Sequence, residues 1–147
     1  MKALVIYDSQ FGNTEQIAKA IGGGIEGEVK VVRFGDVKAA ELGSYDLLIV
    51  GSPTQGGRYT MSMKGFLDTI PSDSLKNVRV AAFDTRLKTK LVKIFGYAAT
   101  RIADTLKIKG GNLVAPAEGF LVKGAKGHIL DGELERAAAW AKDIAAK

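Results

Sequence analysis

Short apolar runs recur along the chain at intervals that suit the strands of a single sheet. They are nearly continuous in Val, Ile, Leu and Ala, which is typical of strands buried on both faces of a parallel sheet. The runs occupy residues 3–7, 29–34, 47–50, 78–83 and, more weakly, 113–122. The pattern therefore predicts five strands.

Apolar stripes at helical spacing fill the gaps between these runs. The first predicts a helix over residues 14–21, with Asn13 as its N-cap. Further helices are predicted over residues 63–70, over residues 97–107 and from about residue 131, and residues 36–42 could hold one or two turns. Strands that alternate with helices indicate right-handed crossovers and helices on both sheet faces. The predicted fold is an open five-stranded parallel α/β sheet.

Composition narrows the classes of function. The 147 residues include no cysteine and one histidine, which excludes a disulfide, a thiolate metal site, a thiol nucleophile and a multi-histidine metal site. The apolar runs are too short to cross a bilayer. We expect one domain over residues 1–147, cytoplasmic, with no membrane association. The net charge of +5 is uneven, since residues 74–147 hold 14 Lys/Arg and 7 Asp/Glu whereas residues 1–73 hold 7 and 9.

The first predicted strand leads directly into a helix through a polar loop. Its sequence is Asp8-Ser9-Gln10-Phe11-Gly12-Asn13-Thr14. Hydroxyl and amide donors beside the free N–H groups of a helix N-terminus form a cradle for a phosphate, and Gly12 permits a close backbone approach. On this loop alone, an ordinary capped turn is an equal alternative.

A second glycine pattern is rejected as a ligand site. Gly22, Gly24 and Gly27 match the dinucleotide-binding spacing G-x-G-x-x-G, which requires a strand before it and a helix after it. Here the order is reversed, so we interpret these glycines as the exit of the first helix.

The third predicted strand is followed by another loop rich in small and polar residues. It reads Gly51-Ser52-Pro53-Thr54-Gln55-Gly56-Gly57-Arg58-Tyr59. Glycines and nearby hydrogen-bond donors suit the edge of a flat heteroaromatic ring. Arg58 and Tyr59 could stack on the face of such a ring. A long surface turn is the alternative. Both loops follow strands at the carboxyl edge of the predicted sheet, where open α/β folds bind ligands.

Together, the two loops resemble the FMN-binding loops of the flavodoxin family, and the order of elements matches a short-chain flavodoxin-like domain. The resemblance implies a sheet of order 2-1-3-4-5 with FMN at its carboxyl edge. The FMN phosphate would be held by Ser9, Gln10, Gly12, Asn13 and Thr14, next to Phe11. The isoalloxazine would be contacted by Pro53, Thr54, Gln55, Gly56 and Gly57, with Arg58 adjacent.

Three positions depart from the family pattern. Phe11 stands where flavodoxins usually have Thr or Ser, so one hydroxyl to the phosphate is absent. Gln55 lies near the place of a Trp that is common in electron-transfer flavodoxins. A third loop, beginning with Asp84, Thr85 and Arg86, lacks the Tyr that often covers the other ring face.

Residues 85–96 are strongly basic and could form either a loop over the flavin or an extension of the next helix. As a loop, they would place Arg86, Lys88, Lys90 and Lys93 around the mouth of the site. Positive charge favours the anionic form of reduced flavin. We therefore expect a less negative second reduction couple than an acidic flavodoxin would have.

The leading functional hypothesis is an FMN-binding electron-transfer protein in which no side chain is a catalytic acid or nucleophile. Such a protein would exchange electrons with a redox partner protein. The partner would be acidic if it binds the basic half of this chain. The alternative is a small NAD(P)H- or quinone-dependent FMN oxidoreductase that accepts a small planar substrate. A non-redox binding module is a third possibility. A nucleic-acid partner is not expected because no recognised motif or interleaved aromatic pattern is present. The sequence leaves the oligomeric state open.

Overall fold

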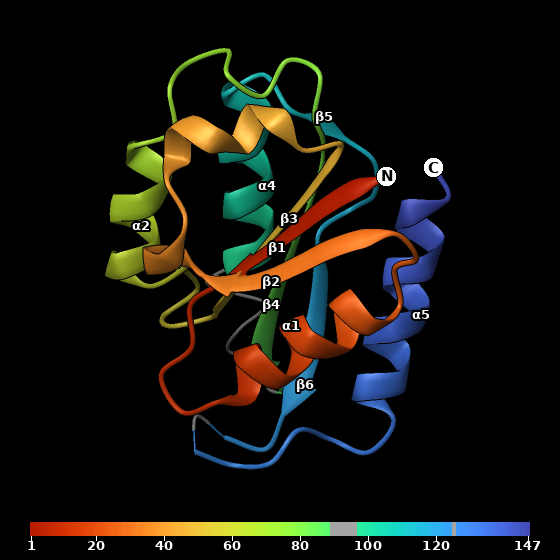
Figure 1. The fold of residues 1–147 in the computed structure, drawn as a ribbon. Helices are drawn as coiled ribbons and strands as arrows, with labels where there is room; N and C mark the ends of the chain where they lie inside the picture. The colour runs from red at the N-terminus through yellow and green to blue at the C-terminus, as the bar shows by residue number, and fades with distance from the viewer. Residues whose placement is uncertain (89–96, 125) are drawn as a thin grey trace.

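The computed structural model describes residues 1–88, 97–124 and 126–147 and shows one parallel sheet. The strands are β1 (Lys2–Tyr7), β2 (Glu28–Arg33), β3 (Leu47–Pro53), β4 (Arg79–Leu87), β5 (Asn112–Leu113) and β6 (Glu118–Val122). Their order is β2-β1-β3-β4-β5, and β6 also pairs with β4. All of these pairings are parallel. In Figure 1, β1, β2 and β3 run toward the left and β4 and β6 run toward the bottom, and both termini lie at the upper right. The predicted order 2-1-3-4-5 is confirmed.

The fifth position of the sheet is divided between two short strands. β5 pairs with the start of β4, at Arg79 and Val80, whereas β6 pairs with its end, from Phe83 to Leu87. Pro116 lies between them and has no N–H to donate to a ladder. The single strand predicted over residues 113–122 is therefore wrong in its continuity, although its place in the sheet is right.

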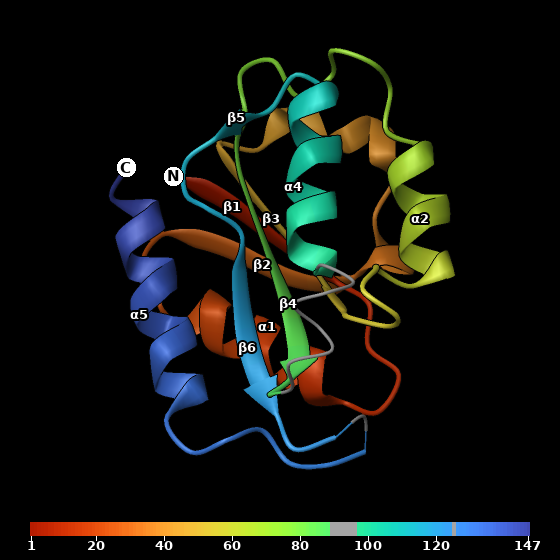
Figure 2. The same ribbon diagram turned by 180° about the vertical axis from the view of Figure 1, so that it is seen from behind.

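Helices cover both faces of the sheet, as predicted. α1 (Asn13–Gly23) and α5 (Glu133–Ala145) pack on one face, and α2 (Met61–Asp68) and α4 (Ala98–Ile108) pack on the other (Figures 1 and 2). Two 3₁₀ turns, η1 (Phe34–Asp36) and η2 (Ala39–Ser44), lie in the region where turns were expected. Each face buries its own apolar cluster, and the central strands β1 and β3 contribute alternate side chains to both. Among the described residues, no helix combines the length and the apolar character needed to cross a bilayer.

Two predictions at the carboxyl edge are corrected. The N-cap of α1 is Gly12, with φ of 98°, and Asn13 is the first helical residue. β4 continues to Leu87, so Asp84, Thr85 and Arg86 lie in a strand and do not begin a loop. They are held there on both sides, because β3 and β6 pair with this end of β4. The predicted loop or helix over residues 85–96 lies, from residue 89 onward, outside the described residues.

The glycine-rich exit of the first helix is confirmed. α1 ends at Gly23 with Gly24 as its C-cap, and Gly27 has φ of 109° just before β2. A Cβ atom on Gly24 would lie 2.2 Å from the carbonyl oxygen of Ala138 in α5. These glycines therefore serve the turn and the packing of α1 against α5.

Candidate functional site

A pocket opens where the carboxyl ends of β1, β3, β4 and β6 meet. It is lined by Ser9, Gln10, Phe11, Asn13, Thr14, Pro53, Thr54, Gln55, Thr85, Arg86, Leu87 and Val122. The fold thus brings both predicted loops and the end of β4 to one place. Leu87 and Val122 join the lining although the sequence analysis did not select them. Five selected residues do not line the pocket: Gly12, Gly56, Gly57, Arg58 and Asp84.

The first loop presents donors to this pocket. The N–H of Gly12 donates to Ser9 Oγ at 3.0 Å, which leaves the Ser9 hydroxyl proton available for another acceptor. Within the described part of the chain, the N–H groups of Gln10, Asn13 and Thr14 have no hydrogen-bond acceptor. The first turn of a helix lacks internal acceptors for its N–H groups, and its positive dipole end favours an anion. None of the described residues that line the pocket is a carboxylate, so this arrangement suits a phosphate.

One acidic residue does lie in the first turn of α1, and its charge is compensated. Glu15 accepts a hydrogen bond from Lys19 at 3.1 Å and another from the Tyr7 hydroxyl at 3.0 Å. These contacts hold the pKa of Glu15 below its usual value, with Lys19 the largest cause. Burial and the bond to Glu15 raise the pKa of Tyr7. Glu15 is therefore an ionised carboxylate paired with Lys19 on the helix surface.

Asn13 has a role that the sequence analysis missed. Its side-chain amide donates to the carbonyl of Gly127 at 2.7 Å and, more weakly, to that of Gly124 at 3.4 Å. This contact ties the start of α1 to the turn after β6, far away in the sequence. No local pattern marks such a tether, because both acceptors are backbone carbonyls. The side chain is thus a brace for the first loop.

The paired glycines of the second loop form a tight turn. Gln55 and Arg58 exchange backbone hydrogen bonds of 2.8 and 3.1 Å, and Gly56 and Gly57 both have positive φ, 57° and 79°. Positive φ at both central positions is the signature of a type I′ turn. The glycines are therefore required by the turn conformation, and Gln55 beside them reaches across the pocket, where its Nε2 donates to Gln10 Oε1 at 2.8 Å.

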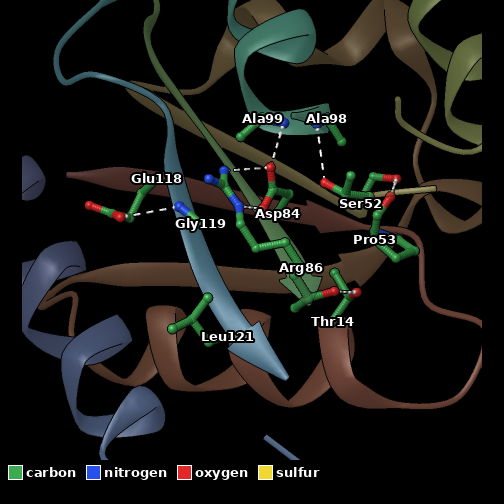
Figure 3. A network of polar contacts seen from close by, with 12 residues as sticks. Thr14, Ser52, Pro53, Asp84, Arg86, Ala98, Ala99, Glu118, Gly119 and Leu121 are labelled. Atoms are coloured by element: carbon green, nitrogen blue, oxygen red, sulfur yellow. Dashed lines mark hydrogen bonds and ion pairs between the residues drawn. The ribbon is translucent and has the colours of Figure 1, made fainter. Parts of the chain in front are cut away.

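The end of β4 carries a buried ion pair (Figure 3). Asp84 is fully buried, and its two carboxylate oxygens accept from Arg86 Nε at 2.7 Å and Nη2 at 2.8 Å. The guanidinium also lies over the Tyr97 ring, 3.4 Å from its centroid. Gly119 of β6 leaves room for it, since a Cβ atom there would lie 2.1 Å from the guanidinium carbon. Arg86 is thus held against the pocket wall with its charge neutralised.

Asp84 and Thr54 also accept hydrogen bonds from the N-terminus of α4, although both lie far from it in the sequence. The N–H of Ala99 donates to Asp84 at 2.9 Å, and the N–H of Ala98 donates to Thr54 Oγ1 at 3.2 Å. Asp84 and Thr54 therefore satisfy the first turn of a helix that has no cap of its own. On the other side, the buried hydroxyls of Thr14 and Thr85 lie 2.8 Å apart and join α1 to β4.

These contacts change the expected electrostatics of the mouth. Arg86 was expected to add positive charge there, but Asp84 compensates it. Lys88 is exposed at the end of β4, and Lys90 and Lys93 lie outside the described residues. Further cations come from the turn after β6, where Lys126 Nζ lies 5.2 Å from the centroid of the Phe11 ring.

Comparison with known proteins agrees with this geometry. The sequence model of the Flavodoxin family matches residues 5–140. The chain is 29% identical over 129 residues to a flavodoxin of Maridesulfovibrio salexigens, a match that covers 74% of this chain and 86% of that protein. It is 37% identical over 76 residues to a flavodoxin of Aquifex aeolicus, covering 49% of this chain and only 41% of that protein.

A solved flavodoxin from the domain Archaea has the same fold over its whole length. It superposes with a TM-score of 0.82 at 32% sequence identity, covering 99% of this chain and 97% of that one. The family match spans nearly all of the described residues, and it includes both loops and the end of β4 that line the pocket. This chain therefore belongs to the flavodoxin family of FMN-containing electron-transfer proteins.

Proposed function

We propose that this chain binds FMN in the pocket without a covalent bond and carries electrons between redox proteins. The observation that carries the proposal is the meeting of two donor sets. N–H groups at the start of α1 that find no acceptor in the described part of the chain, together with the polar loop after β3, open onto one pocket. None of the described lining residues is a carboxylate. A phosphate monoester joined to a planar ring has the complementary chemistry.

The residues divide into two groups by the part of the ligand that they would hold. Ser9, Gln10, Asn13 and Thr14 offer the hydroxyl and N–H donors that suit the phosphate. Pro53, Thr54, Gln55, Thr85 and Arg86 line the rest of the pocket, where the ring would fit. When bound, FMN supplies the one- and two-electron chemistry, and the chain supplies position, shielding and charge.

The rim of the pocket supports an acidic protein as the partner. Phe11 and Leu87 are large apolar side chains that are 53% and 43% exposed. Exposed lysines stand beside them: Lys88 follows Leu87, Lys123 follows Val122, and Lys126 lies over Phe11. An apolar centre with a cationic rim complements an acidic surface. Association with such a partner should therefore slow steeply as ionic strength rises.

A purified preparation tests the proposal. We expect a yellow protein that releases FMN on denaturation, identified by chromatography against FMN, FAD and riboflavin standards. Anaerobic NADH or NADPH alone should leave the flavin oxidised, whereas a reduced acidic redox protein should bleach it at a rate that falls with added salt. Rapid bleaching by NAD(P)H alone would favour the oxidoreductase alternative. A colourless protein that takes up no added FMN would refute the proposal.

A further inference from the structure

A polar network lies beneath the first loop, outside the pocket. Its centre is Asp8, the residue after β1, which is 4% exposed. The guanidinium of Arg33, at the end of β2, approaches the same place from the neighbouring strand. Arg33 Nη2 donates to the Asp8 carboxylate at 3.3 Å and to the carbonyl oxygen of Ser9 at 2.8 Å. Ser9 lines the pocket, whereas Asp8 and Arg33 are not among its lining residues.

The bond to the Ser9 carbonyl fixes the orientation of one peptide group. A trans peptide points its C=O and its N–H in opposite directions, and the described backbone contains no cis bond. With the Ser9 carbonyl directed at Arg33, the N–H of Gln10 must point away from Arg33. That N–H has no acceptor within the described residues, and Gln10 lines the pocket.

We propose that Arg33 is a positioning residue for phosphate binding, acting through the Ser9–Gln10 peptide without touching the ligand. This inference rests on the proposed function, because the phosphate belongs to FMN. Losing Arg33 lets this peptide rotate, so that the Gln10 N–H is no longer held ready for the phosphate. The variant should therefore bind the phosphate part of FMN more weakly, and its contacts with the ring part should be unchanged.

Asp8 holds Arg33 in place and connects it to the second loop. Its carboxylate also accepts from the hydroxyl of Thr60. Thr60 caps α2, because its Oγ1 accepts from the N–H of Met63 at 3.0 Å, and its own N–H donates to Ser52 Oγ at 3.2 Å. The position of Arg33 is therefore set by residues that flank both loops of the pocket. The Arg33 side chain is itself 46% exposed, so its replacement opens no cavity in the core.

The test compares two ligands that differ only in the phosphate. Apoprotein is titrated with FMN and with riboflavin, and flavin fluorescence reports binding. Arg33→Met is expected to weaken FMN binding about tenfold, the usual scale of a hydrogen bond to a charged group. Riboflavin affinity should change by less than about twofold, since riboflavin offers no phosphate to the Gln10 N–H. The matched control is Lys30→Met, which removes an exposed positive charge from the same strand and should leave both affinities within about twofold because exposed charges are screened.

Several results would overturn the inference. Equal losses for FMN and riboflavin in Arg33→Met would mean that Arg33 supports the fold in general. An equal loss of FMN affinity in Lys30→Met would mean that the loss of a positive charge, and not the contact with Ser9, weakens FMN binding in Arg33→Met. Arg33→Lys provides a second variant. Its ammonium can still donate to the Ser9 carbonyl, so its FMN affinity should be at least partly restored relative to Arg33→Met. No such recovery, in a variant with a wild-type melting temperature, would count against the proposal. A wild-type protein that binds FMN while Arg33→Met binds it equally well overturns this inference alone, whereas a wild-type protein that binds neither flavin overturns the proposed function as well.

Discussion

The buried pair of Asp84 and Arg86 makes the strongest prediction about stability. Replacing Asp84 by Ala removes the partner of a guanidinium whose side chain is only 17% exposed, and it also removes the acceptor of the Ala99 N–H. Three hydrogen bonds of 2.7, 2.8 and 2.9 Å are lost together. Breaking one side of a buried ion pair costs about 3–5 kcal/mol, because the remaining charge stays buried without compensation. We expect Asp84→Ala to lower the free energy of unfolding by about that amount.

A double-mutant cycle separates this mechanism from a simple cavity. Arg86→Met removes the charge while it keeps most of the side-chain volume, so the double variant Asp84→Ala/Arg86→Met should be more stable than Asp84→Ala alone. Urea unfolding of the apoproteins, followed by circular dichroism, gives the free energies, and similar m-values would show that unfolding stays two-state. The reasoning is refuted if Asp84→Ala costs less than about 1 kcal/mol, or if the double variant loses the sum of the two single losses.

Three further predictions concern the packing and the charge of the described fold. Arg136 and the Leu121 N–H hold the pKa of Glu133 below its usual value; this stabilisation is therefore present above the unfolded-state pKa and is lost as pH falls through the folded-state pKa. Glu133→Gln should melt below wild type at pH 7, and the gap should close below about pH 4; a gap that persists at low pH would contradict this. Gly51→Ala should cost about 1–3 kcal/mol or more, because its Cβ would lie 2.1–2.3 Å from the Phe83 ring. Gly56→Asn should be nearly neutral in the same urea assay, because nothing lies within 4 Å and Asn suits the first central position of a type I′ turn; a large loss there would contradict the turn assignment.

Much of the fold follows from local sequence. The apolar runs that became β1 and β3 are almost wholly buried, as their composition predicts, whereas the edge strand β2 is only partly buried. The alternation of these runs with helical stripes leaves few topologies. The placement of the two loops then follows from topology, because parallel strands end at one edge. Eight of the pocket-lining residues lie on these two loops, and the flavodoxin resemblance indicated them as ligand contacts.

The rest depended on contacts between distant parts of the chain. Asp84 looks like the end of a strand because a carboxylate is costly to bury, and only its pairing with Arg86 and with the N–H of Ala99 allows β4 to continue. The position of Asn13 in the sequence is typical of a helix cap. Its side-chain amide instead donates to the backbone carbonyls of Gly124 and Gly127, more than 100 residues away. Arg33 carries no motif at all, and its contact with the Ser9 carbonyl arises because β1 and β2 lie side by side.

The most direct test of the account is a titration of the apoprotein with FMN. We predict saturable binding of one FMN per chain, with quenching of flavin fluorescence, and weaker binding of riboflavin because the donors at the start of α1 serve the phosphate. Thr14→Val, which removes one hydroxyl that lines the pocket, should weaken FMN binding. The absence of any saturable binding of FMN to a folded apoprotein would contradict the central claim.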